Sequence, residues 1–120
     1  MIDIAALGLA LCLNTGVMDC DSITYEYDET MKRQRANGIT LLYKPSGRQV
    51  IKITTEYKNN KEVLENILIH ELAHAHGQQQ GGSIKSNHRH GKVFREACET
   101  LTTNLETTDI RICRKEANFG

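Results

Sequence analysis

The sequence H-E-L-A-H at residues 70–74 constrains this chain more than any other feature. An α-helix turns once in about 3.6 residues, so side chains four positions apart lie on the same face. His70 and His74 can therefore bind one metal ion from one helix. Glu71 lies one step around the helix, where its carboxylate can reach a water on the metal without taking a coordination position. The pattern predicts a zinc site (Zn2+) with an open position and a general base beside it.

The flanking residues predict that this motif lies in a buried helix at about residues 60–76. Asn59 or Asn60 can cap the start of the helix, and Gly77 is a natural stop because glycine adopts the left-handed conformation easily. Apolar residues cover two faces of the helix, which indicates burial on two sides. They are Val63, Leu64, Ile67, Leu68, Leu72 and Ala75.

A third ligand is expected among the remaining histidines, since all five lie between residues 70 and 90. His76 follows His74 by two positions and so points away from the ligand face. His88 and His90 lie in a polar loop, and either one can swing toward the metal. Gly91 permits a sharp turn into the next helix, which favours His90.

The rest of the chain predicts an α+β, zincin-like fold. Period-two alternation and turn residues indicate strands at 22–28, 38–44 and 48–55, with a turn at 45–47. The predicted order is an N-terminal helix at 4–13, a three-stranded antiparallel-type sheet, the helix at 60–76 and a following helix at 92–103. Residues 109–114 are expected to form a short strand or an extended segment on the core. Which strand lies at the sheet edge, where a peptide can bind, is left open.

Length and charge limit the kind of protein. A chain of 120 residues with 39% hydrophobic residues predicts one globular domain spanning 1–120. The formal net charge is zero, so no global field attracts nucleic acid. Two local basic clusters fit either a solvated face or a DNA contact. They are Lys32, Arg33 and Arg35, and Lys85, Arg89, Lys92 and Arg95.

The cysteines at 12, 20, 98 and 113 form no C-x-x-C pair, so no zinc ribbon is expected. The apolar stretch 4–13 lacks a positively charged start and a small-residue cleavage site, and it is shorter than the roughly 20 residues that span a bilayer. We therefore expect no membrane partner, a cytoplasmic location and four reduced, buried cysteines.

Residues 35–101 resemble the SprT-like metallopeptidases, a family that includes the Spartan proteases acting on DNA–protein crosslinks. The resemblance is carried by A-N-G-I-T-L-L-Y, G-R-Q-V-I-K-I-T, E-V-L-E-N-I-L-I-H-E-L-A-H-A and H-G-K-V-F. It implies that His70, His74 and His90 are the ligands, that Glu71 is the base, and that the substrate is a protein or peptide. Fuller members carry a C-terminal zinc ribbon or basic DNA-binding segments, and this chain shows neither pattern.

The leading hypothesis is a zinc-dependent endopeptidase. Its candidate substrates include proteins that are bound or crosslinked to DNA. One alternative is a non-catalytic, zinc-stabilised DNA- or protein-binding module, which a fourth protein ligand such as His88 or Cys98 would favour. Another is a zinc hydrolase of a non-peptide substrate. Two further roles are assigned only by residue type. Candidates to orient a ligand histidine are Glu96, Glu99 and Asp109, and candidates to stabilise the transition state are Arg89, Arg95 and Tyr43.

Overall fold

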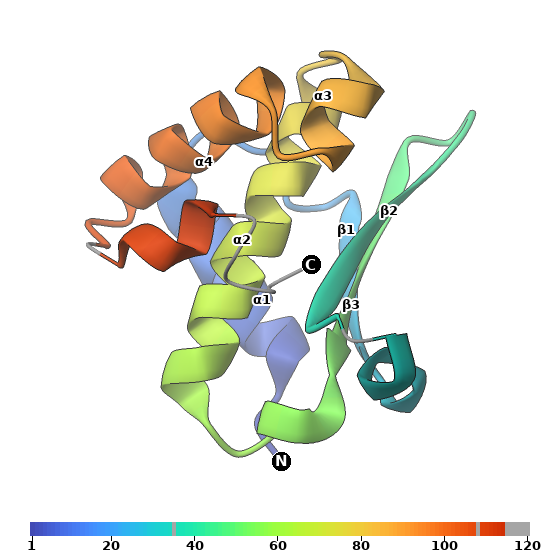
Figure 1. Cartoon of the computed structure of the whole chain (residues 1–120), viewed down its shortest axis with the longest axis vertical. Helices are drawn as coiled ribbons and strands as arrows, with labels where there is room; N and C mark the ends of the chain where they lie inside the picture. The colour runs from blue at the N-terminus through green and yellow to red at the C-terminus, as the bar shows by residue number, and fades with distance from the viewer. Residues whose placement is uncertain (35, 108, 115–120) are drawn as a thin grey trace.

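The computed structural model describes residues 1–34, 36–107 and 109–114, and within them the fold is α+β (Figure 1). The helices are α1 (Ile4–Thr15), α2 (Lys61–Gln79), α3 (Ile84–His88) and α4 (Lys92–Asn104). The strands are β1 (Ile23–Asp28), β2 (Gly38–Tyr43) and β3 (Arg48–Thr54). Short 3-10 helices are η1 (Glu29–Gln34), η2 (Thr55–Tyr57) and η3 (Ile110–Cys113).

The sheet is mixed, with the strand order β1-β3-β2. β2 and β3 form the predicted antiparallel hairpin, but β1 runs parallel to β3, so the prediction of an antiparallel-type sheet was wrong for this strand. The turn at 45–47 determines the hairpin locally. No local signal determines the direction of β1, because the chain passes through η1 to the far edge before β3 returns between the two outer strands. β2 is consequently an edge strand.

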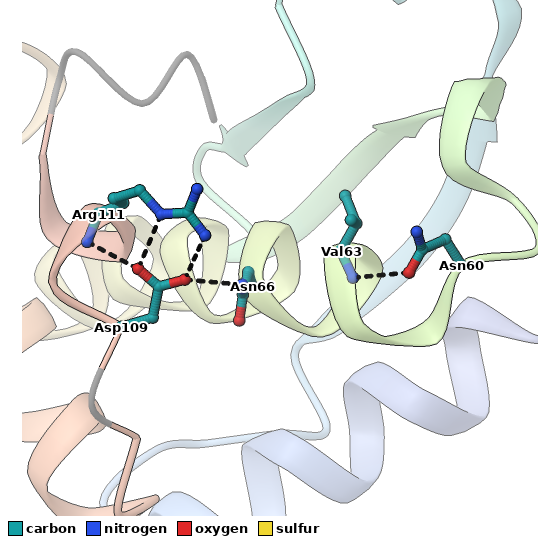
Figure 2. Close-up of polar contacts among 5 residues, drawn as sticks. All are labelled: Asn60, Val63, Asn66, Asp109 and Arg111. Carbon is teal, nitrogen blue, oxygen red and sulfur yellow. Dashed lines mark hydrogen bonds and ion pairs between the residues drawn. The ribbon is translucent and has the colours of Figure 1, made fainter.

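Helix α2 begins as predicted but ends later. The Asn60 side chain caps it by accepting a hydrogen bond from the Val63 amide at 3.2 Å (Figure 2). The helix continues to Gln79, past the predicted stop at Gly77. Gly77 is needed for a different reason: a Cβ there would lie 2.9 Å from the side-chain amide nitrogen, Nδ2, of Asn87. The glycine is therefore a point of close packing inside the helix.

Helix α2 lies at the centre of the molecule, with the sheet on one side and α4 on the other, and it also contacts α1 (Figure 1). The predicted apolar face of α4 is confirmed, because Phe94, Ala97, Cys98 and Leu101 are all buried. Phe94, Cys98 and Leu101 pack in one core with Ile51 and Ile53 of β3 and with Leu64, Leu68 and Leu72 of α2. Within the described ranges, no helix has the length and apolar character needed to cross a membrane.

Two segments differ from their predicted structure. The polar loop before α4 contains the short helix α3. The segment after α4 is neither a strand nor extended, since Ile110–Cys113 forms the 3-10 helix η3. Its packing on the core was predicted correctly: Ile112 is fully buried in the main cluster.

The prediction of four reduced cysteines was wrong. Cys12 is bonded to Cys20, and Cys98 to Cys113. Each pair joins one helical residue to a residue outside that helix, so spacing along the chain gave no signal for the pairing. Because the four cysteines are paired, they give no support to a cytoplasmic location, which stays a prediction.

Candidate metal centre

Three histidine side chains from two segments meet beside α2. His70 and His74 come from successive turns of α2, and His90 comes from the link between α3 and α4. The Nε2 atom of His90 lies 3.2 Å from the Nε2 atoms of both His70 and His74. Two nitrogens bound tetrahedrally to one zinc ion lie about 3.3 Å apart, given Zn–N bonds of about 2.0–2.1 Å. The spacing therefore suits a metal ion of this size.

The hydrogen bonds of two rings determine which nitrogens face the centre. Nδ1 of His70 lies 2.5 Å from the carbonyl oxygen of Ile112 and must donate to it, because a carbonyl only accepts. Nδ1 of His74 donates to Oδ1 of Asn87 at 3.1 Å. In each neutral ring Nε2 is then an acceptor. One proton on His90 Nε2 can serve only one of these acceptors at a time, whereas a central cation satisfies all three, so the donor set fits a metal.

His90, and not His88, joins this group. The three histidines that could hold a metal are His70, His74 and His90, whereas His88 is exposed. His90 has a left-handed backbone with φ of 59°, which is uncommon for a residue other than glycine. Gly91 itself has a negative φ, and its small size matters because a Cβ would lie 2.8 Å from the Ser86 hydroxyl. The sharp turn before α4 favours His90 over His88, as expected. The residue with the left-handed backbone in that turn is His90 itself, and not Gly91.

The groups that hold Nδ1 of His70 and Nδ1 of His74 are not carboxylates. His70 is held by the main-chain carbonyl of Ile112, and His74 by the side chain of Asn87. Asn87 also donates to the main-chain carbonyl of His74 at 2.8 Å. The three predicted candidates make other contacts or lie on the surface: Asp109 binds Asn66 and Arg111, and Glu96 and Glu99 are exposed. An asparagine and a backbone carbonyl carry no recognisable signal in the sequence.

Phe94 forms an apolar floor under the site. Its ring centroid lies 4.3 Å from that of His74 and 4.8 Å from those of His70 and His90. Phe94 is fully buried. An apolar wall of this kind limits the access of water to the rear of a metal site and lowers the local dielectric.

Glu71 is fully buried beside the histidines, at the position expected of a base. Its Oε1 accepts a hydrogen bond from the Thr40 hydroxyl at 2.8 Å. Its Oε2 has no hydrogen-bond partner among the described residues. Burial raises the pKa of Glu71 to about 8, and the Thr40 hydrogen bond opposes this shift. Gly38 permits the arrangement, because a Cβ there would lie 3.0 Å from the carboxylate.

A cleft of about 810 Å³ opens onto Glu71, His74 and His90. One wall is the edge strand β2, and the other is formed by the end of α2 and by α3. Thr40, which sequence reasoning missed, lies on the β2 wall and donates a hydrogen bond to Glu71. The site is therefore reached along an unpaired strand edge.

The three candidates to stabilise the transition state, Arg89, Arg95 and Tyr43, differ in their positions. Arg89 lines the cleft, whereas Tyr43 is absent from its lining and is 50% exposed. Arg95 is exposed on α4.

In the second basic cluster Lys85, Arg89, Lys92 and Arg95 are all exposed. In the first, Arg33 is exposed, and Arg35 lies outside the described residues.

Comparison with known proteins gives one match. A family model described as the SprT-like family matches residues 15–114. No curated protein and no solved structure matches the chain. The matched range includes the three histidines, Glu71, Thr40, Asn87 and Ile112.

Proposed function

Because the family match covers most of its length, the chain belongs to the SprT-like family, and we propose that it is a zinc-dependent endopeptidase with a zincin-like fold. One observation carries the proposal: three convergent histidine Nε2 atoms lie beside a buried carboxylate, in a cleft bounded by a sheet edge. Each part has a separate use in peptide hydrolysis. None of these parts suggests a purely structural role.

Zinc is the metal that best suits the donor set. Three neutral imidazoles with a fourth position left for water are the pattern of catalytic zinc sites, whereas structural sites usually have four protein ligands. In the described part of the chain, the group contains no fourth histidine, cysteine or carboxylate. When bound, zinc would polarise the scissile carbonyl and lower the pKa of a water to about 7.

Glu71 is suited to move the proton. Its Oε1 is held by Thr40, which leaves Oε2 to act toward the cleft. Its raised pKa brings a carboxylate close to the range in which it both takes and returns a proton near neutral pH. In the proposed reaction, Glu71 takes a proton from the attacking water and then delivers it to the leaving amine.

The edge strand β2 is suited to hold the substrate. β2 pairs with β3 on one side only. An extended peptide can add to the open side through main-chain hydrogen bonds, and Thr40 and Ile39 of β2 line the cleft beside the histidines. Such binding recognises the backbone and depends little on side chains, which fits a protease of unfolded or loosely structured segments.

A non-catalytic binding module is less well supported. It would need a fourth protein ligand, and the two residues considered for that role are poorly suited. Cys98 is bonded to Cys113, and His88 is exposed outside the histidine group. DNA contact is a separate proposal, which rests on the exposed cluster Lys85, Arg89, Lys92 and Arg95.

The deciding experiment compares zinc-loaded wild type with Glu71→Gln on an unstructured protein substrate, with and without single-stranded DNA. We expect the variant to keep zinc and to lose cleavage by at least about 100-fold, the typical contribution of a general base. Undiminished cleavage by Glu71→Gln would overturn the mechanism. Stimulation of wild type by DNA would support DNA-linked substrates, and indifference to DNA would leave a general peptidase.

A further inference from the structure

The contact between His70 and Ile112 joins the metal site to a distant part of the chain. The two residues are 42 positions apart, and the bond runs from a ligand ring to a main-chain oxygen. Because this oxygen belongs to the main chain, it does not depend on which side chain stands at position 112. The orientation of His70 therefore depends on what holds the backbone of η3 in place.

One anchor of η3 is polar (Figure 2). Asp109 caps η3 by accepting from the Arg111 amide at 3.0 Å, and its carboxylate also binds the Arg111 guanidinium. Asn66 of α2 donates to the same carboxylate at 3.2 Å. Arg111 is exposed, and ion pairs at exposed positions contribute little. This anchor fixes the start of η3 but is weak.

The other anchor is covalent and lies next to the carbonyl. Cys113 directly follows Ile112 and is bonded to Cys98 of α4, which is fully buried. The disulfide ties the end of η3 to the helix that also carries Phe94, the floor of the site. Cys113 is only partly buried, so a reductant can approach the bond from that side.

We propose that the Cys98–Cys113 disulfide sets the metal affinity of the histidine site by holding the Ile112 carbonyl against His70. Reduction by a dithiol adds two electrons and two protons, which gives two cysteine thiols and converts the dithiol to its own disulfide. The end of η3 is then released, and His70 loses the partner that orients its ring. Coupling of this kind is reciprocal, so bound metal makes the disulfide harder to reduce.

The second disulfide of the chain supplies a matched control. Cys12–Cys20 joins α1 to the segment between α1 and β1, and neither supplies one of the three histidines or the group that orients His70 or His74. Zinc affinity is measured by chelator competition on metal-free wild type, Cys98→Ser/Cys113→Ser and Cys12→Ser/Cys20→Ser. We expect about tenfold weaker binding in the first double variant, the low end for loss of an orienting partner, and no change in the second. Equal losses in both, or no loss in either, would overturn the proposal.

A second measurement uses wild-type protein, so it does not depend on how well a variant folds. Both disulfides are equilibrated in a dithiol redox buffer with and without buffered free zinc, and the thiols are counted by alkylation and mass spectrometry. Tenfold coupling corresponds to a shift of about 30 mV for a two-electron couple. We expect this shift for Cys98–Cys113 alone. An unshifted Cys98–Cys113 pair would overturn the coupling, whatever the result of the peptidase assay.

Discussion

His70 and His74 lie one helical turn apart and face the same point, yet they are oriented by partners of different kinds. His74 is held by the Asn87 side chain, which bonds both its ring and its main-chain carbonyl. His70 is held by a main-chain carbonyl from the far end of the chain. One support is a local side chain, and the other is a distant segment of backbone.

The difference teaches how each support can fail. A single substitution at Asn87 removes the orienting group of His74. No substitution at Ile112 removes a carbonyl, so the support of His70 fails only if η3 moves. The Asn87 support is therefore sensitive to sequence, and the Ile112 support is sensitive to the anchors of η3.

Replacement of Asn87 by Ala should have the largest effect. It removes the acceptor of His74 Nδ1 and the side-chain donor that the main-chain carbonyl of His74 receives from Asn87. We expect zinc affinity to fall by about 10- to 100-fold, as is typical when an orienting partner of a ligand is lost. Isothermal titration with zinc checks the value. Affinity equal to that of wild type would show that His74 needs no partner to keep its orientation.

Glu71 extends the comparison to a buried group that has a hydrogen-bond partner on one of its two oxygens among the described residues. Its pKa of about 8 lies above the ordinary glutamate value of 4.5, because burial disfavours the charged form. Between these two values the folded state keeps a proton that the unfolded state has released. The free energy of unfolding of metal-free protein should therefore fall as the pH rises through this window, by up to about 1.4 kcal/mol per pH unit.

Glu71→Gln should remove this contribution, because glutamine does not titrate. Urea unfolding of metal-free wild type and Glu71→Gln, from about pH 5 to about pH 8, measures the difference between the slopes. Parallel pH profiles would mean that the unsupported oxygen is solvated in solution. The Thr40 hydroxyl would then be only one of several groups that stabilise the carboxylate.

Much of the fold and the grouping of the three histidines could be predicted from the sequence. The start of α2, the hairpin of β2 and β3 and the apolar face of α4 all follow from local periodicity, caps and turns. The meeting of His70 and His74 follows from helical spacing, and the choice of His90 over His88 from the turn and the family resemblance.

The rest depended on contacts between distant segments. The parallel pairing of β1 with β3 is set by a crossover, and no residue of β1 specifies it. Gly77 looked like a helix end because its packing partner, Asn87, lies ten positions further on. The support of His70 is a backbone oxygen, which every residue has, so sequence offered no means of choosing Ile112.

Replacement of Ile112 by Val tests whether the backbone support is independent of its side chain. The Ile112 side chain is fully buried, so loss of a methylene should lower the free energy of unfolding by about 0.5–1.5 kcal/mol. The carbonyl remains, and zinc affinity should stay that of wild type. Urea unfolding and zinc titration measure the two quantities separately. A loss of affinity like that of Asn87→Ala would mean that side-chain packing, more than the disulfide and Asp109, positions the carbonyl.

Replacement of Gly77 by Ala should have the smallest effect and perturbs the Asn87 support without deleting it. The new Cβ would lie 2.9 Å from Nδ2 and 3.1 Å from Oδ1 of Asn87, so the amide has to shift while its bonds to His74 resist. Alanine is favoured over glycine inside a helix by up to about 1 kcal/mol, which offsets much of the crowding. We therefore expect little change in thermal stability but a weaker zinc affinity, with a smaller loss than in Asn87→Ala.

Gly8→Ala in α1 is the matched control, because its Cβ would lie 2.4 Å from the Tyr25 ring and touch no group of the metal site. That variant should lose stability and keep its zinc affinity, and the opposite outcomes in the two glycine variants would separate the orientation of His74 from the general stability of the fold.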